Sequence, residues 1–184
     1  MSLNFPAIQD ALFKWCSTTL GADVAGNIFW FPFMGTKLPK PSVMLKLVGP
    51  EKKGFTDNFD GTTLSGPREA TLTVETFSDP DTQIIQEGAL SNSTASAQDL
   101  ASRLLSSVDD PNVIDALQDK GIGIGGVTPI TDISELLDTK YESRQHFEIT
   151  LHLADTRTSL VDTGNGPDAG QILAVEVDTN LGGH

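Results

Sequence analysis

A glycine-rich run, GIGIGG at residues 121–126, has the spacing of a dinucleotide-binding fingerprint, with Gly121, Gly123 and Gly126 as its three glycines. That chemistry needs a strand before the glycines and a helix N-terminus after them, because backbone amides at the helix start hold the pyrophosphate. Here a helical pattern precedes the glycines, and residues 127–129 open a strand-like run. The inverted order favours a helix stop followed by a strand bulge over a nucleotide site.

Two loops carry the oxygen ligands that calcium prefers. One is TDNFDG, with Asp57 and Asp60, and the other is DTGNGPD, with Asp162, Asn165 and Asp168. Neither has the alternating ligands and the closing glutamate of an EF-hand. Asp, Asn and Gly are also the usual residues of turns. The two loops are therefore interpreted as turns, and no metal is predicted.

The histidines and the single cysteine do not form a catalytic pattern. His146 and His152 share one face of a strand, but six residues at ~3.3 Å each place them ~20 Å apart, too far to share a zinc ion. Cys16 lies on the apolar stripe of a helix, where a buried structural thiol is expected. No G-x-S-x-G elbow is present. The residues predict neither an enzyme nor a cofactor site.

The element that positions most of these polar side chains is the stretch at 139–154, TKYESRQHFEITLHLA. A period of two predicts a long strand with one face on a core and one charged face. The apolar side chains of the stretch fall on odd positions: Tyr141, Phe147, Ile149, Leu151 and Leu153. The charged and histidine side chains fall on even positions: Glu142, Arg144, His146, Glu148 and His152.

The rest of the chain predicts an α+β fold with a mostly antiparallel sheet and helices packed on one face. Helices are predicted at 5–20, at 97–108 and directly after Asp110, with Asn4, Pro6 and Gly21 as start and stop signals of the first. Strands are predicted at 28–33, 42–49, 68–78, 122–133 and 171–181, and loops at 50–65, 79–96 and 155–170. No linker or repeat interrupts 1–184, so one domain with a core over about 5–178 is predicted.

The charge of the chain limits its partners. The net charge is −13, with 25 acidic and 12 basic residues among 184. A dedicated nucleic-acid binder or a protein of anionic membrane surfaces needs a basic face, which this composition does not favour. No apolar run is long enough to span a bilayer, and no secretory signal begins the chain, so a cytoplasmic setting is expected.

Several stretches together resemble the neck or tail terminator family of long-tailed phages, in particular those with contractile tails. These are an opening helix followed by KLPKPSVMLKL (37–47), GPREATLTVETFSDPD (66–81), the helical AQDLASRLLSSV, and residues 122–151. The sharpest part runs from Thr131 to Phe147, a DIS-x-LLDT segment and then an aromatic-Glu-x-Arg strand. The similarity covers most of residues 5–178.

The resemblance implies a structural virion protein assembled in the host cytoplasm, without catalysis or cofactor. It implies a homo-oligomeric ring, usually of six copies, that caps the tail tube, stops its growth and forms the docking surface for the head-side connector. Tail tube and sheath proteins are the other implied partners, and DNA only passes through the channel. Six copies at −13 each would carry −78, a field that discourages passing DNA from adhering. An ordinary soluble surface explains the same charge.

Two other functions remain open at this point: another head–tail joining or tail-completion subunit, and a small-molecule binding module that uses the glycine-rich turn. For the ring, the mixed charges of the strand predict a subunit interface at Glu142, Arg144 and Glu148. Complementary charges fix the register of two docked surfaces, and Arg suits bidentate pairing with carboxylates.

Overall fold

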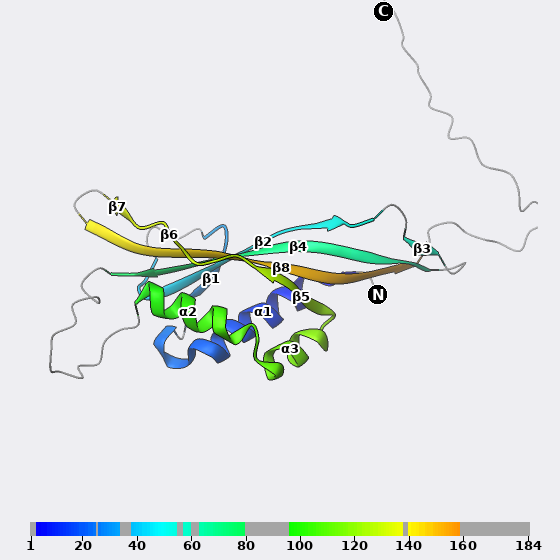
Figure 1. The fold of residues 1–184 in the computed structure, drawn as a ribbon, viewed down its shortest axis with the longest axis horizontal. Helices are drawn as coiled ribbons and strands as arrows, with labels where there is room; N and C mark the ends of the chain where they lie inside the picture. The colour runs from blue at the N-terminus through cyan, green and yellow to red at the C-terminus, as the bar shows by residue number, and fades with distance from the viewer. Residues whose placement is uncertain are drawn as a thin grey trace, which may run out of the picture.

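The computed structural model describes residues 3–24, 26–33, 38–54, 57–59, 63–79, 96–137 and 140–158. The described chain forms a sheet with the strand order β1-β2-β4-β8-β5, and three α-helices lie against one face of it (Figure 1). The helices are α1 (Phe5–Leu20), α2 (Ala97–Ser107) and α3 (Pro111–Gln118), and a 3₁₀ turn, η1 (Gly21–Val24), follows α1. The strands are β1 (Ile28–Trp30), β2 (Ser42–Lys52), β3 (Asn58–Phe59), β4 (Thr63–Ser78), β5 (Ile122–Val127), β6 (Thr131–Asp132), β7 (Glu135–Leu137) and β8 (Lys140–Thr158).

This arrangement confirms the predicted α+β class. Among the residues that the structure describes, every strand pair is antiparallel except β1–β2, which is parallel. The two longest strands, β4 and β8, pair from Thr63↔Thr158 to Ser78↔Ser143 and form the centre of the sheet. β5, β6 and β7 follow one another along the opposite edge of β8. The long strands extend beyond the helices in Figure 1, so the helical layer covers their middle.

The helices begin where the sequence predicts, because their caps are local. The side chain of Asn4 accepts a hydrogen bond from the backbone of Ala7, and a proline occupies the first turn of α1. Asp110 caps α3 in the same way, through the backbone N–H of Asn112. A side chain of α2 caps the C-terminal end of α1: Arg103 donates hydrogen bonds from Nη2 to the carbonyl oxygens of Thr19 and Leu20.

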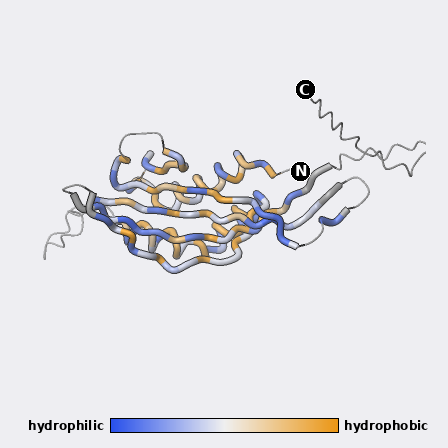
Figure 2. Tube along the Cα trace, turned by 90° about the horizontal axis from the view of Figure 1, so that it is seen from above, coloured by the Kyte–Doolittle hydropathy of each residue, from blue (hydrophilic) through white to orange (hydrophobic). Residues whose placement is uncertain are grey.

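The core lies between the helices and one face of the sheet. Along β8, the odd positions from 143 to 155 are buried, and the even positions are partly or fully exposed. The predicted register of this strand is therefore correct, and Phe147 is fully buried. Figure 2 shows the resulting alternation of hydrophilic and hydrophobic residues along the long strands. Cys16 is fully buried as predicted, and burial raises the pKa of its thiol.

Several strand boundaries differ from the prediction. The predicted loop at 50–65 contains the last residues of β2, all of β3 and the first residues of β4. β8 continues to Thr158, four residues into the predicted loop at 155–170. The predicted strand at 28–33 is shorter, and that at 122–133 is divided into β5 and β6. In the segment 50–65, pairing with a neighbouring strand overrides the local turn preference of its Gly, Pro and Asn residues.

Three predictions fall outside the described residues. These are the loop at 79–96, apart from its first and last residues, the loop at 155–170 beyond residue 158, which includes DTGNGPD, and the strand at 171–181. The single-domain organisation over 1–184 stays a prediction.

An ionic cluster takes the place of apolar contacts at the end of β4 and β8 that lies near β3. Arg68 is 5% exposed and forms two hydrogen bonds with Asp57, from Nη1 at 2.9 Å and Nη2 at 3.0 Å. Its Nη2 also lies 3.0 Å from Asp155 Oδ2. The hydrogen bonds with Asp57 and the charges of both carboxylates raise the pKa of Arg68, against the effect of desolvation. The cluster joins the β2–β3 connection to the helix side of the sheet.

Candidate functional site

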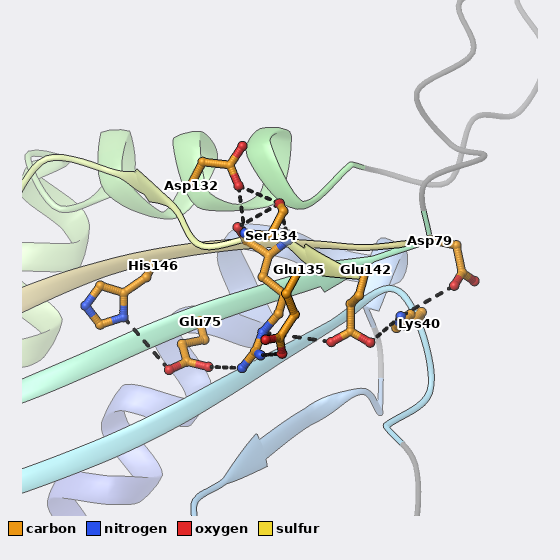
Figure 3. Close-up of polar contacts among 9 residues, drawn as sticks. Lys40, Glu75, Asp79, Asp132, Ser134, Glu135, Glu142 and His146 are labelled. Atoms are coloured by element: carbon orange, nitrogen blue, oxygen red, sulfur yellow. Dashed lines mark hydrogen bonds and ion pairs between the residues drawn. The ribbon is translucent and has the colours of Figure 1, made fainter. Parts of the chain in front are cut away.

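The candidate site is the face of the sheet that points away from the helices. β8 places its even-numbered side chains there and β4 its odd-numbered ones, because the alternate side chains of both strands enter the core. Figure 3 shows a connected series of ion pairs and hydrogen bonds on this face, from His146 to Asp79. Most of the side chains come from β4, the consecutive strands β7 and β8, and the segment before β2.

Arg144 is the centre of this series. Its Nη1 lies 2.6 Å from Glu135 Oε1 on β7, and its Nη2 lies 3.2 Å from Glu75 Oε2 on β4. Its Nε lies 3.8 Å from Glu142 Oε1, which is an ion pair but too long for a hydrogen bond. The guanidinium carbon lies 4.9 Å from the ring centroid of Phe77, the residue directly across from Arg144 on β4.

These contacts explain why Phe77 is buried on the outer face. Its side chain points away from the helices, yet it is only 2% exposed. The guanidinium of Arg144 covers the ring and is itself held by carboxylates from three strands. The Arg144 side chain is 22% exposed, so the charged groups lie at the surface. The Phe77 ring beneath them is shielded from solvent.

Lys40 extends the cluster toward the segment that precedes β2. Its Nζ lies 2.6 Å from Glu142 Oε2 and 3.5 Å from Asp79 Oδ1. The Lys40 side chain is only 10% exposed, so Glu142 is held between two cations, Lys40 and Arg144. We call Lys40, Glu75, Glu135, Glu142 and Arg144 the Arg144 cluster, which contains two cations and three carboxylates.

The structure brings together two of the three predicted interface residues. Glu142 and Arg144 lie in the same cluster, whereas Glu148 lies further along β8. The Glu148 side chain is 43% exposed, and its carboxylate lies 3.8 Å from Nε2 of His146. His146 also lies 3.9 Å from Glu75 through Nδ1, and both distances are too long for hydrogen bonds.

Sequence reasoning missed four residues of this site: Lys40, Glu75, Phe77 and Glu135. The alternation of residues 68–78 does place Glu75 on the polar face of its strand. Its position beside Arg144 depends on the pairing of β4 with β8, where Glu75 faces His146. Glu135 approaches through β7, which turns back along β8 and pairs Glu135 with Glu142.

The turn into β7 is held by a local hydrogen-bond arrangement. Asp132 accepts hydrogen bonds from the backbone N–H and, at 2.5 Å, from the hydroxyl of Ser134. These bonds lower the pKa of Asp132, because they favour the charged carboxylate. The backbone N–H of Arg144 donates to Ser134 Oγ at 3.0 Å, which fixes the turn to β8 beside the cluster.

The glycine-rich run has the predicted structural role. Helix α3 precedes it, Gly121 has a φ of +73°, and the pairing of β5 with β8 shifts by one residue between Ile124 and Gly126. This confirms the interpretation as a helix stop and a strand bulge. A Cβ at Gly125 would lie less than the van der Waals distance from the imidazole of His152, an exposed side chain that would have to move aside.

Among the described residues, no three His, Cys, Asp or Glu side chains converge in a group that could hold a metal ion. The carboxylates of the Arg144 cluster are paired with cations instead. Within the same residues, no helix is long and apolar enough to cross a bilayer. The arrangement on the outer face can hold strands together and present a fixed pattern of charge to another surface.

The described chain is thus an α+β domain whose outer face carries a series of ion pairs between strands. A family model described as phage neck terminator protein matches residues 7–183, and this chain belongs to that family. The match confirms the resemblance seen in the sequence. The family is structural and non-enzymatic, and the protein is a component of the phage virion at the neck and tail.

Comparisons with individual proteins add little to the family assignment. One solved structure aligns with 81% of this chain and 95% of its own length, at 15% sequence identity. The TM-score is 0.33, which is too low to support an argument about fold or function. A search of curated protein sequences finds no significant match.

Proposed function

We propose that this neck terminator forms a ring of six copies that caps the tail tube, ends tail growth and provides the docking surface for the head-side connector. The observation that carries the proposal is the family match over residues 7–183. Tail tube and sheath proteins would contact one side of the ring, and the connector would contact the other. The ring charge of −78 would keep DNA from adhering as it passes.

We further propose that the Arg144 cluster belongs to the subunit contact or braces the strands that make it. Arg144 pairs with carboxylates from β4, β7 and β8, so one side chain sets the relative positions of three strands. Glu135 and Glu148 keep side-chain exposures of 48% and 43% and are available to a neighbouring subunit. A fixed pattern of both charges gives register to such a contact and rejects wrong docking.

The ring is tested by native mass spectrometry and negative-stain microscopy of the purified full chain. Six chains of 19.6 kDa predict a particle of about 118 kDa with a central hole. A protein that stays monomeric at tens of micromolar, with and without tail tubes, would overturn the ring. Cofractionation with tube ends supports capping, and cofractionation only with head-side proteins would favour another joining subunit instead.

The role of the cluster is tested by Arg144→Glu. This change places a fourth carboxylate beside Glu75, Glu135 and Glu142, and the expected result is a chain folded by circular dichroism that no longer forms rings or caps tails. Lys53→Glu is the matched control, because it makes the same charge change at a side chain that is 51% exposed and outside the cluster. An Arg144→Glu protein that forms rings and tails of normal length would refute the assignment.

A further inference from the structure

The large exposed apolar side chains that the structure describes gather on α1 and at the two opposite edges of the sheet. Phe31 and Val48 lie at the edge formed by β1 and the second half of β2. Val127 and Ile133 lie at the other edge, at the end of β5 and directly after β6. Exposed apolar groups at open sheet edges favour contact with another protein surface.

The first of these edges carries a cation without a carboxylate partner. Lys46 points to the outer face of β2, because Val43 and Leu45 alternate with it and enter the core. Its Nζ lies 5.0 Å from the centroid of the Phe31 ring, and it pairs with no carboxylate among the described residues. β1 pairs with β2 only as far as Leu45, so within the described chain the later residues of β2 are themselves the edge of the sheet. We call Phe31, Lys46 and Val48 the Lys46 edge.

The opposite edge has the complementary charge. The side chain of Glu148 points to the outer face of β8, and its carboxylate accepts no hydrogen bond among the described residues. Val127 pairs with Ile149, on one side of Glu148. On its other side, the backbone N–H of Ile133 donates to the carbonyl oxygen of Arg144. Glu148 therefore lies between two exposed apolar residues, and we call Val127, Ile133 and Glu148 the Glu148 edge.

Cross-strand pairing places the two edges in register. Lys46 on β2 and Glu148 on β8 pair with the same residue of β4, so the cation and the carboxylate belong to one row across the outer face. The next row begins at Val48 and ends at Gly126, directly before Val127. Two copies that lie side by side at equal height along their strands therefore bring Lys46 toward Glu148, and Val48 toward Val127.

We propose that the Lys46 edge of one copy docks against the Glu148 edge of the next copy, in a head-to-tail contact that repeats around the ring. This inference rests on the proposed ring and names the two surfaces that close it. The exposed apolar side chains of the two edges are buried against each other, and the ion pair between Lys46 and Glu148 fixes the register of the contact. Two different surfaces on opposite sides of one chain generate a ring when the rotation between copies closes.

Thiol crosslinking of full-length chains tests the contact. Val48→Cys marks one edge and Val127→Cys the other, both at exposed positions, and Cys16 stays silent because it is fully buried. A short bismaleimide should join the two variants when they are co-expressed and should leave each variant alone uncrosslinked, because in a head-to-tail ring an edge never meets itself. In the matched control, Gln98→Cys, exposed on α2, replaces Val127→Cys. Docked edges have a high local concentration of the two thiols, so the control should react at least about tenfold more slowly.

Native mass spectrometry of the same samples separates the edge contact from the ring itself. Rings of six copies without the crosslink between the two edges would overturn this inference and leave the ring intact. The crosslink in an assembly of another size would support the edge contact and overturn the ring of six. A monomer without crosslinks would overturn both. A crosslink of Val48→Cys with itself would indicate a twofold pair, outer face on outer face, and would also overturn the head-to-tail contact.

Charge reversal tests the ion pair. Lys46→Glu places a carboxylate against Glu148 of the neighbour, and it should raise the concentration needed for half-assembly at least about tenfold at low salt. Lys46→Glu combined with Glu148→Lys restores opposite charges and should restore assembly. Lys14→Glu on α1 is the matched control, an exposed lysine that also lacks a carboxylate partner among the described residues, and it should assemble normally. Assembly unaffected by Lys46→Glu, or a double variant that assembles no better than Lys46→Glu alone, would remove this ion pair from the contact.

Discussion

Phe147 provides the sharpest test of how β8 is placed, because its neighbour Glu148 lies on the opposite face of the same strand. The Phe147 side chain is fully buried and faces Val74 across the β4–β8 pair. Phe147→Ala removes most of a buried aromatic side chain and leaves a cavity, which costs ~3–5 kcal/mol of the free energy of unfolding. A domain has ~5–15 kcal/mol in total, so the loss is a large fraction of it.

This loss in the free energy of unfolding corresponds to a decrease in the melting temperature, Tm. For a chain of 150–250 residues, 1 kcal/mol shifts Tm by ~2–4 °C, so Phe147→Ala should lower Tm by ~6–20 °C. Phe147→Asp should be more severe, because it also places an unpaired charge in the core. Glu148→Gln is the control: its side chain is 43% exposed, and its backbone N–H keeps the hydrogen bond to Thr128, so the change should stay within ~0.5 kcal/mol.

The assay is thermal unfolding followed by circular dichroism, at one protein concentration for all variants, because assembly makes Tm depend on concentration. We expect a large decrease in Tm for Phe147→Ala and a small one for Glu148→Gln. The reverse order would mean that β8 is displaced by one residue, which exchanges the two faces of the strand.

Two further outcomes follow from contacts outside the Arg144 cluster. Arg68→Ala should cost more than ~1 kcal/mol, because it removes the cation that Asp57 and Asp155 share, although Asp57 keeps its ion pair with Lys52; urea unfolding measures this, and a smaller loss would contradict it. Gly125→Val should cost little, because its Cβ meets only the outer end of the exposed His152 side chain, which can move aside. A Tm loss as large as that of Phe147→Ala, not recovered by adding His152→Ala, would show that the glycine is needed for another reason.

The helices and the faces of the strands could be predicted from the sequence. Asn4, Pro6 and Gly21 mark the ends of α1, and the alternation of residues 141–153 assigns the buried side of β8. These features are local, since a cap satisfies backbone groups within one turn and a period of two reports which side of one strand is apolar. The resemblance to the neck terminator family likewise rested on short stretches read along the chain.

Only the tertiary structure decided which polar side chains meet. Alternation placed Arg144 on the polar face of β8, but its partners Glu75 and Glu135 are 69 and 9 residues away in sequence and arrive through the register of β4 and the turn into β7. The burial of Phe77 under the Arg144 guanidinium also depends on how β4 pairs with β8. A strand's own pattern contains no information about the register of its neighbours, because register is set by pairing between segments that the chain brings together only on folding.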